Sequence, residues 1–151
     1  MAAEPGSAHA GIELVSCRFG TEWYAVPIAA VREIVRCGPV TFVPGLPAHI
    51  RGLTSIRGTI LSVTDPKPLF GLPLGSPATE LARLIVIDAG GHQTAVLVDE
   101  VDAVFTAGRD ALEPPMATLP AERARYVTAL CRLRDRVLAV LNPATHVLPA
   151  R

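Results

Sequence analysis

Apolar residues form short runs along the chain, separated by turns rich in glycine, proline and charged residues. Residues 12–19 are rich in β-forming side chains, and residues 23–26 form a second such run after the turn Gly20-Thr21-Glu22. Two such runs joined by a tight turn predict a β-hairpin. Two further strands are predicted over residues 40–43 and 59–64.

The second half of the chain is predicted to hold more strands. Three short runs have β-branched apolar residues on both faces, which is typical of buried strands: 84–87, 94–98 and 101–105. Residues 126–133 and 136–141 predict a last antiparallel pair across the turn Arg134-Asp135. Short strands in both halves favour two small barrels over one sandwich, so the predicted fold class is mainly β.

Two short helices are expected beside the strands. Pro27 suits the first turn of a helix, and apolar residues follow at helical spacing at 28, 31, 34 and 35. This pattern predicts an amphipathic helix of about two turns. Near the end of the chain, Asn142 and Pro143 suit the cap and first position of a second helix that continues to residue 148.

Proline and glycine mark the irregular parts of the chain. Residues 1–10 offer nothing to bury and predict a flexible lead, followed by a single domain over residues 11–149. Residues 65–79 contain four prolines and two glycines, which predicts a linker between the halves. Residues 108–120 contain three more prolines and predict a long irregular connection.

Composition and charge exclude several classes of partner. The chain has 151 residues, half of them apolar, and 14 basic residues balance 14 acidic ones. No basic footprint for nucleic acid follows from such a balance, so shape and apolar contact are expected to select the partners. Membrane insertion is not expected, because no apolar run approaches the ~20 residues that span a bilayer. With no leader pattern at the N-terminus, the protein is predicted to be cytoplasmic.

The residue types that carry chemistry are scattered. Cys17, Cys37 and Cys131 are far apart and form no metal-ligand pattern, so reduced thiols are expected. The serines and histidines show no nucleophile elbow, which favours a protein that is not an enzyme and needs no cofactor. Glu100 and Asp102 flank Val101 and could share a strand face; cation binding is one interpretation, and surface solvation is the preferred one.

A central motif, residues 50–65, contains the pairs Arg51-Gly52 and Arg57-Gly58. The run from Gly52 to Gly58, followed by a strand that ends at Asp65, resembles the central motif of the CheW family of bacterial chemotaxis adaptors. Further elements in matching order are similar to that family: 24–27, 31–34, 44–47 and 98–104. The resemblance therefore covers nearly the whole chain from residue 12 to about residue 148.

The resemblance implies a fold, a function and partners. The fold would be two intertwined SH3-like five-stranded β-barrels with short helices, the first roughly residues 11–72 and the second roughly 82–141, with the terminal segments intertwined. The function would be that of a non-catalytic adaptor. It would couple the cytoplasmic tip of a chemoreceptor to the regulatory domain of a chemotaxis histidine kinase through a groove between the barrels. The alternative from another class is a stand-alone regulatory barrel module that binds a non-chemotactic kinase, a cyclase or a peptide.

The resemblance also indicates a protein-binding site. By motif position, the implied site residues are Val31, Glu33, Gly52, Ile56, Arg57, Gly58, Ala95, Val101 and Val104. Arg57 could contact the partner or brace the barrel junction, and Glu33 could simply pair with Arg36. Valine and isoleucine side chains are more often core than contact residues, so an alternative interpretation places Val31, Ile56, Val101 and Val104 in the core. Among the departures from the family pattern, Pro66 stands where an apolar residue is usual, and Asn142-Pro143 replaces an acidic helix start.

Overall fold

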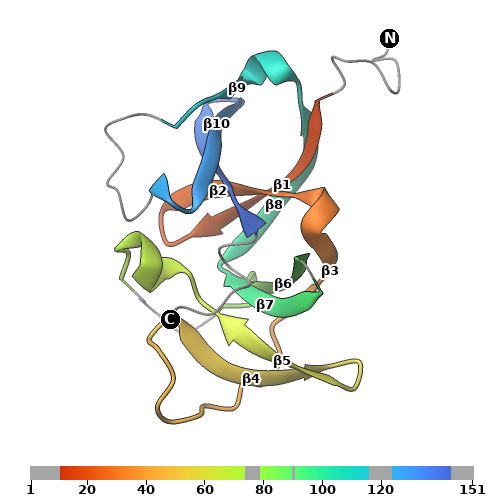
Figure 1. Ribbon diagram of the computed structural model, residues 1–151, viewed down its shortest axis with the longest axis vertical. Helices are drawn as coiled ribbons and strands as arrows, with labels where there is room; N and C mark the ends of the chain where they lie inside the picture. The colour runs from red at the N-terminus through yellow and green to blue at the C-terminus, as the bar shows by residue number, and fades with distance from the viewer. Residues whose placement is uncertain (1–10, 74–78, 90, 116–123, 144–151) are drawn as a thin grey trace.

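The computed structural model describes residues 11–73, 79–89, 91–115 and 124–143, which form two β-sheets (Figure 1). The six-stranded sheet has, in spatial order, β8 (Glu100–Ala107), β1 (Ile12–Phe19), β2 (Glu22–Pro27), β11 (Arg136–Leu141), β10 (Val127–Leu133) and β9 (Leu112–Glu113). The five-stranded sheet has β3 (Val31–Arg36), β6 (Arg83–Ala89), β7 (His92–Val98), β5 (Thr59–Thr64) and β4 (Ile50–Ile56). The predicted mainly β fold with two strand assemblies is confirmed.

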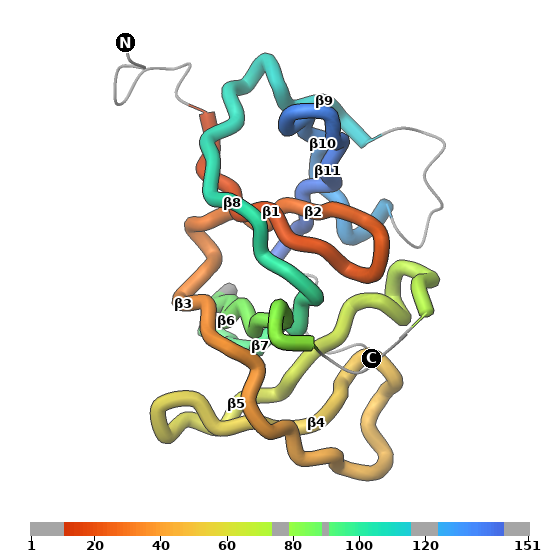
Figure 2. Tube along the Cα trace, turned by 180° about the vertical axis from the view of Figure 1, so that it is seen from behind, coloured from red at the N-terminus to blue at the C-terminus, as the bar shows by residue number. Residues whose placement is uncertain are grey.

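The two sheets are interleaved along the chain. The opening hairpin β1–β2 pairs with the late strands β8 and β11, whereas the five-stranded sheet is built from the middle of the chain. Figure 2 shows the first and last strands together in the upper part of the molecule, above β3 to β7. The terminal segments therefore share one sheet. The barrel boundaries, roughly 11–72 and 82–141, stay a prediction, and they cut across this pairing because β1 and β2 lie with β8 to β11.

The core consists of three apolar clusters, and the largest joins the two sheets. This inter-sheet cluster combines residues of β1 and β2, such as Val15 and Phe19, with residues of β6 and β7, such as Ile85 and Val98. The second cluster lies within the five-stranded sheet and the third within the six-stranded sheet. Because the inter-sheet cluster takes residues from both sheets, burial of its apolar area holds the two sheets together.

The five-stranded sheet is nearly closed into a barrel. Its outer strands are β3 and β4, and the chain that leaves β3 returns to β4 through a bridge between Thr41 and Leu53. The two residues exchange backbone hydrogen bonds, with N···O distances of 2.7 and 2.9 Å. Among the described residues of the six-stranded sheet, no ladder joins β8 to β9. The expectation of five strands per barrel therefore differs for this sheet, where the two-residue β9 adds a sixth.

The helix predicted from Pro27 to residue 35 is wrong. A single turn of 3-10 helix, η1 (Ile28–Ala30), is followed directly by β3, which pairs with β6. Burial alternates along β3, with Val31, Glu33 and Val35 half-buried and the residues between them exposed. The apolar spacing fitted a helix, but β-branched side chains and alternation favour a strand once β6 supplies a partner.

Most of the other predicted elements agree with the structure. The opening hairpin, the three strands of residues 83–107 and the final pair β10–β11 are confirmed. The strand predicted over 40–43 is reduced to the single bridge at Thr41. The linker contains a second 3-10 helix, η2 (Lys67–Phe70), and residues 108–115 hold η3 (Arg109–Ala111) and β9. The lead 1–10 and residues 144–148 of the predicted last helix lie outside the described residues.

No helix within the described ranges is long and apolar enough to cross a membrane.

Candidate protein-binding site

The turn between β4 and β5 is formed by Arg57 and Gly58. Their backbone φ angles are +52° and +82°, so both residues occupy the left-handed region. Two consecutive residues of this kind are typical of the tight turn that matches the twist of a two-residue β-hairpin. Glycine adopts this conformation freely, whereas arginine does so at a cost. The local sequence thus places the Arg57 side chain at the tip of the hairpin, where it is 77% exposed.

Arg57 is paired with Glu33 across the opening of the five-stranded sheet. Its Nε donates a hydrogen bond to Glu33 Oε1 at 2.9 Å. The partner that the sequence offered for Glu33 was Arg36, and that interpretation is wrong, because alternating strand geometry puts Arg36 on the other face of β3. The ion pair joins β3 to the β4–β5 hairpin and fixes an exposed guanidinium beside a carboxylate.

Residue 52 must be a glycine for a different reason than residue 58. Its φ is +148°, and a Cβ built there would lie 2.0 Å from the carbonyl oxygen of Thr41. The segment after β3 can therefore approach β4 only because residue 52 has no side chain. Gly52 thus secures the Thr41–Leu53 bridge.

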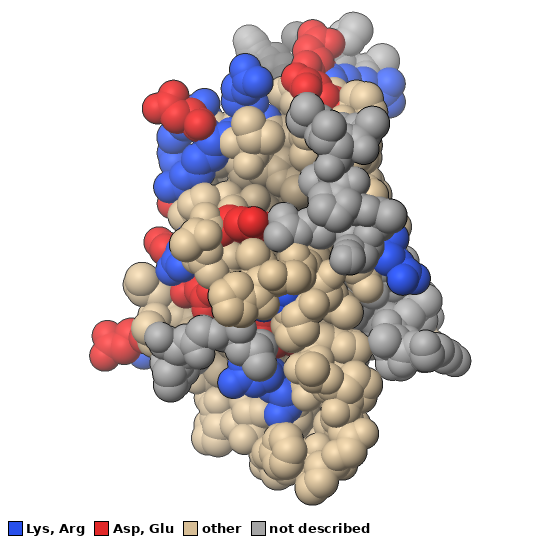
Figure 3. Space-filling view, turned by 90° about the vertical axis from the view of Figure 1, so that its left-hand side faces the viewer, with Lys and Arg blue, Asp and Glu red and all other residues tan. Residues whose placement is uncertain are grey.

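A mostly apolar pocket lies beside this hairpin, with a volume of about 570 Å³. It is lined from β3, β4, β5 and the segment between β3 and β4: Val35, Arg36, Gly38, Pro39, Thr41, Leu53, Thr54, Ser55, Ile56, Ile60 and Leu84. We name it the β4–β5 pocket. The lining residue Ile60 is 69% exposed, and Phe42, which follows the lining residue Thr41 in the chain, is 74% exposed. Figure 3 shows an extended uncharged surface at this end of the molecule. Apolar surface left open in this way is typical of protein contact sites.

The remaining predicted site residues lie near the junction of the two sheets or in the core. Val31 on β3 and Val101 on β8 are half-buried against the inter-sheet cluster, and Val104 on β8 is 62% exposed. Ala95 on β7 is fully buried between β6 and β5. It therefore contributes packing, and its predicted contact with a partner is not supported by its position.

The structure thus separates the predicted site into two parts. Glu33, Ile56, Arg57 and Gly58 gather at the β4–β5 hairpin, whereas the three valines lie on β3 and β8, the outer strands of their sheets. We name these three valines together the junction surface, because Val31 and Val101 pack against the inter-sheet cluster. The sequence analysis did not identify the pocket residues Leu53 and Ile60. The only signal for them in the sequence is that an apolar residue lies on each side of the Arg57-Gly58 turn.

The acidic residues that flank Val101 have basic partners. Glu100 accepts a hydrogen bond from Arg18 Nε at 3.1 Å, and Asp102 Oδ2 lies 3.4 and 3.2 Å from the guanidinium groups of Arg134 and Arg136. Ion pairing therefore replaces both earlier interpretations, cation binding and simple solvation. The part of the chain that the structure describes holds no group of three or more His, Cys, Asp or Glu side chains suited to a metal ion.

Burial shifts the pKa values of the three cysteine thiols and of one histidine. Burial raises the pKa of the Cys17 thiol to about 12. It also raises the pKa of the Cys37 and Cys131 thiols, and at Cys37 the nearby Arg51 charge partly opposes it. The pKa of His49 is lowered, again because burial disfavours the charged form. A protonated thiol is a poor nucleophile, which fits a structural role for the cysteines.

The fold is a small double-sheet module that leaves several large apolar residues exposed. The family described as "CheW-like domain" matches residues 13–147. The chain belongs to this family. A probable chemotaxis protein CheW of Rhizobium etli is 33% identical over 133 residues, which cover 86% of this chain and 83% of that protein. The chemotaxis protein CheW of Klebsiella aerogenes is 27% identical over 132 residues, covering 87% and 79%.

A solved structure supports the same assignment. The scaffolding protein TtCheW from Thermoanaerobacter tengcongensis superposes with a TM-score of 0.77 at 25% identity, over 87% of this chain and 89% of that chain. The resemblance predicted from the central motif is confirmed. With it, the interpretation as a chemotaxis-type adaptor is favoured over the stand-alone regulatory barrel module.

Proposed function

We propose that this CheW-like chain is a non-catalytic adaptor with two protein-binding surfaces that are occupied at the same time. The junction surface binds the cytoplasmic tip of a chemoreceptor, together with the Glu33–Arg57 pair, because Glu33 lies two residues from Val31 on the same side of β3. The β4–β5 pocket binds the regulatory domain of a chemotaxis histidine kinase. No catalysis and no cofactor take part, and the assembly forms in the cytoplasm, where both partners are present.

The observation that carries this proposal is that exposed apolar residues lie in two places on the molecule, at the β4–β5 pocket and at Val104 on β8. The β4–β5 pocket belongs to the five-stranded sheet alone, whereas the junction surface takes Val31 from one sheet and Val104 from the other. Val31 and Val101 pack against the inter-sheet cluster, and the pocket residues Val35 and Ile56 pack against the cluster within the five-stranded sheet. Two partners on such a unit are held in a defined relative orientation, which is what an adaptor must provide.

Arg57 gives the sharpest test of the receptor surface. Arg57→Glu sets two carboxylates against each other at positions 33 and 57 and reverses the charge that faces a partner. The fold should persist, because an exposed ion pair contributes only about 0–1 kcal/mol to stability. Losing a charge-assisted contact at an interface typically costs ~2–5 kcal/mol, which is about thirty-fold or more in affinity.

The assay is a reconstituted mixture of receptor fragment, kinase and adaptor, with circular dichroism as the folding control. Arg57→Glu should reduce receptor-dependent kinase activation sharply. The matched control is Arg132→Glu, which reverses another exposed charge on β10, in the other sheet. If Arg57→Glu supports kinase activation as well as Arg132→Glu and wild type do, the coupling surface does not include the hairpin. The stand-alone regulatory barrel module would then be the favoured interpretation.

A further inference from the structure

One residue carries the chain from the five-stranded sheet to the six-stranded sheet. Strand β7 ends at Val98 and β8 begins at Glu100, so Asp99 alone connects them. The direction in which β8 leaves this corner sets where Val101 and Val104 lie. The junction surface therefore depends on the conformation of Asp99.

Asp99 is held on one side by the six-stranded sheet. Its backbone N–H donates to the carbonyl oxygen of Arg18 at 2.9 Å, and its Oδ2 accepts a hydrogen bond from the N–H of Gly20 at 2.6 Å. Both partners belong to the end of β1 and the turn into β2. These contacts attach the corner to the hairpin that β8 pairs with.

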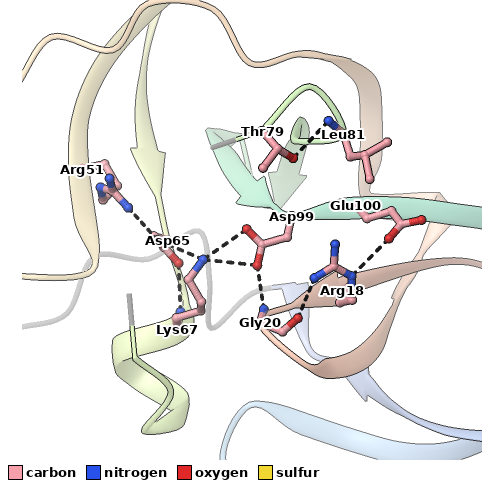
Figure 4. A network of polar contacts seen from close by, with 9 residues as sticks. All are labelled: Arg18, Gly20, Arg51, Asp65, Lys67, Thr79, Leu81, Asp99 and Glu100. Carbon is pink, nitrogen blue, oxygen red and sulfur yellow. Dashed lines mark hydrogen bonds and ion pairs between the residues drawn. The ribbon is translucent and has the colours of Figure 1, made fainter. Parts of the chain in front are cut away.

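Lys67 holds the same carboxylate from the other side (Figure 4). Its Nζ lies 3.4 Å from both oxygens of Asp99 and 3.6 Å from Oδ2 of Asp65, at the end of β5. Asp65 is itself fixed, because Arg51 Nη1 donates to it at 2.9 Å and the Lys67 N–H donates to its Oδ1 at 3.1 Å. Lys67 thus bridges a carboxylate of the five-stranded sheet and the carboxylate of the corner.

Lys67 is buried, and burial of its charge costs free energy unless carboxylates pair with it. Its side chain is only 4% exposed, and that of Asp65 is 0% exposed. A buried ion pair is weak evidence for stability, because desolvation offsets much of the attraction. Its geometry is more informative, since a buried ammonium between two carboxylates restricts both of them to one arrangement.

The segment that carries Lys67 is anchored independently. Phe70, at the end of η2, packs with Phe19 and Tyr24 of the six-stranded sheet, with ring centroids 5.8 and 4.9 Å apart. Lys67 therefore projects from a fixed short helix toward the corner. Removing its charge would release the corner without detaching η2.

From this geometry we propose that Lys67 is a positioning residue for partner binding: it fixes the Asp99 corner and so holds β8, with Val101 and Val104, in the orientation that the receptor tip recognises. The inference rests on the proposed function for its partner, but the effect on β8 is a property of the chain alone. Lys67 itself touches no partner, since it is buried.

The test uses the full chain with Lys67→Met, which keeps most of the length of the side chain and removes its charge. Amide hydrogen exchange should become about ten-fold faster or more at residues 99–104, while amides of β6 keep their wild-type rates. Affinity for a receptor tip fragment should fall about ten-fold, and affinity for the kinase regulatory domain should stay within about two-fold. Lys67→Arg restores a cation at this position. It should bring both the exchange rates at residues 99–104 and the affinity for the receptor tip fragment most of the way back to their wild-type values.

Asp88→Asn is the control, because it removes an acidic group from an outer ion pair on β6 whose N···O distance is 3.9 Å. If Lys67→Met does not fold, Asp99→Asn replaces it, since asparagine keeps an acceptor for the Gly20 N–H and loses the charge that Lys67 binds. Exchange that rises equally in both sheets, or not at all at residues 99–104, would overturn the proposal. Failure of the wild-type chain to bind the receptor fragment would instead refute the proposed function, and the exchange result would still decide the role of Lys67.

Discussion

Gly52→Ala should damage the protein far more than Gly58→Ala, although both residues belong to the same motif. Both glycines have positive φ, so alanine is strained at either position. Around Gly58, an added Cβ meets nothing within 4 Å, whereas at Gly52 it would lie 2.0 Å from the Thr41 carbonyl oxygen. A backbone carbonyl cannot move aside as the end of a flexible side chain can. The Thr41–Leu53 bridge must therefore open in Gly52→Ala.

The magnitudes follow from this difference. Gly58→Ala carries only the left-handed strain, about 1–2 kcal/mol. Gly52→Ala carries backbone strain of about 1–3 kcal/mol and the loss of two hydrogen bonds, about 0.5–1.5 kcal/mol each. For a chain of this length, 1 kcal/mol shifts Tm by about 2–4 °C. The expected fall in Tm is thus about 12 °C for Gly52→Ala and about 4 °C for Gly58→Ala.

Thermal unfolding followed by circular dichroism measures both variants, and urea titration supplies the free energy of unfolding. Ser55→Ala is the matched control, because residue 55 is an exposed position on the same strand as Gly52. Its Tm should stay close to that of wild type. Should Gly52→Ala melt within about 3 °C of Gly58→Ala, the close approach of Thr41 to β4 would not be what residue 52 provides.

Three further outcomes are expected. In native protein, Cys37 should react first with a thiol reagent and Cys17 only after unfolding, because Cys17 is fully buried and its pKa is raised to about 12; native labelling of Cys17 at an equal rate would contradict its burial. The pKa of His49 is lowered, which means that the folded state favours the neutral imidazole. The contribution of His49 to the free energy of unfolding is therefore present above the unfolded pKa of about 6.5 and is lost as the pH falls below that value. Urea titrations at pH 7.5 and 5.5 should therefore show a smaller acid destabilisation in His49→Gln than in wild type, and an equal one would refute the assignment. Glu33→Gln should lower the free energy of unfolding by less than about 1 kcal/mol, because its pair with Arg57 is exposed; a loss of several kcal/mol would make the pair a structural brace.

The strands were predictable where the sequence pattern and the turn chemistry agree. The hairpin over residues 12–27 and the final pair joined at Arg134-Asp135 follow from β-forming runs on either side of a short turn. Residues 28–35 misled because their apolar spacing fits a helical face, and the deciding factor was β6, a partner some fifty residues away in the chain. Pairing between distant strands carries no local signal.

The candidate site was predictable only in part. The motif pointed to Arg57 and Gly58, and the structure shows them at an exposed turn beside a pocket. The pairing of Arg57 with Glu33 could not be read from residues 24 positions apart. The burial of Ala95 likewise depends on neighbours from β5 and β6, and Lys67 stood out in the sequence only as the single lysine.

If the chain is an adaptor, one copy of it binds two partners at once, and sedimentation velocity of a three-component mixture measures this. The components are the full chain, a receptor tip fragment and the kinase regulatory domain. We expect a complex that contains all three, with each fragment bound about as tightly as in its binary complex. Displacement of one fragment by the other as its concentration rises would show that both use the same surface, and it would contradict the adaptor mechanism.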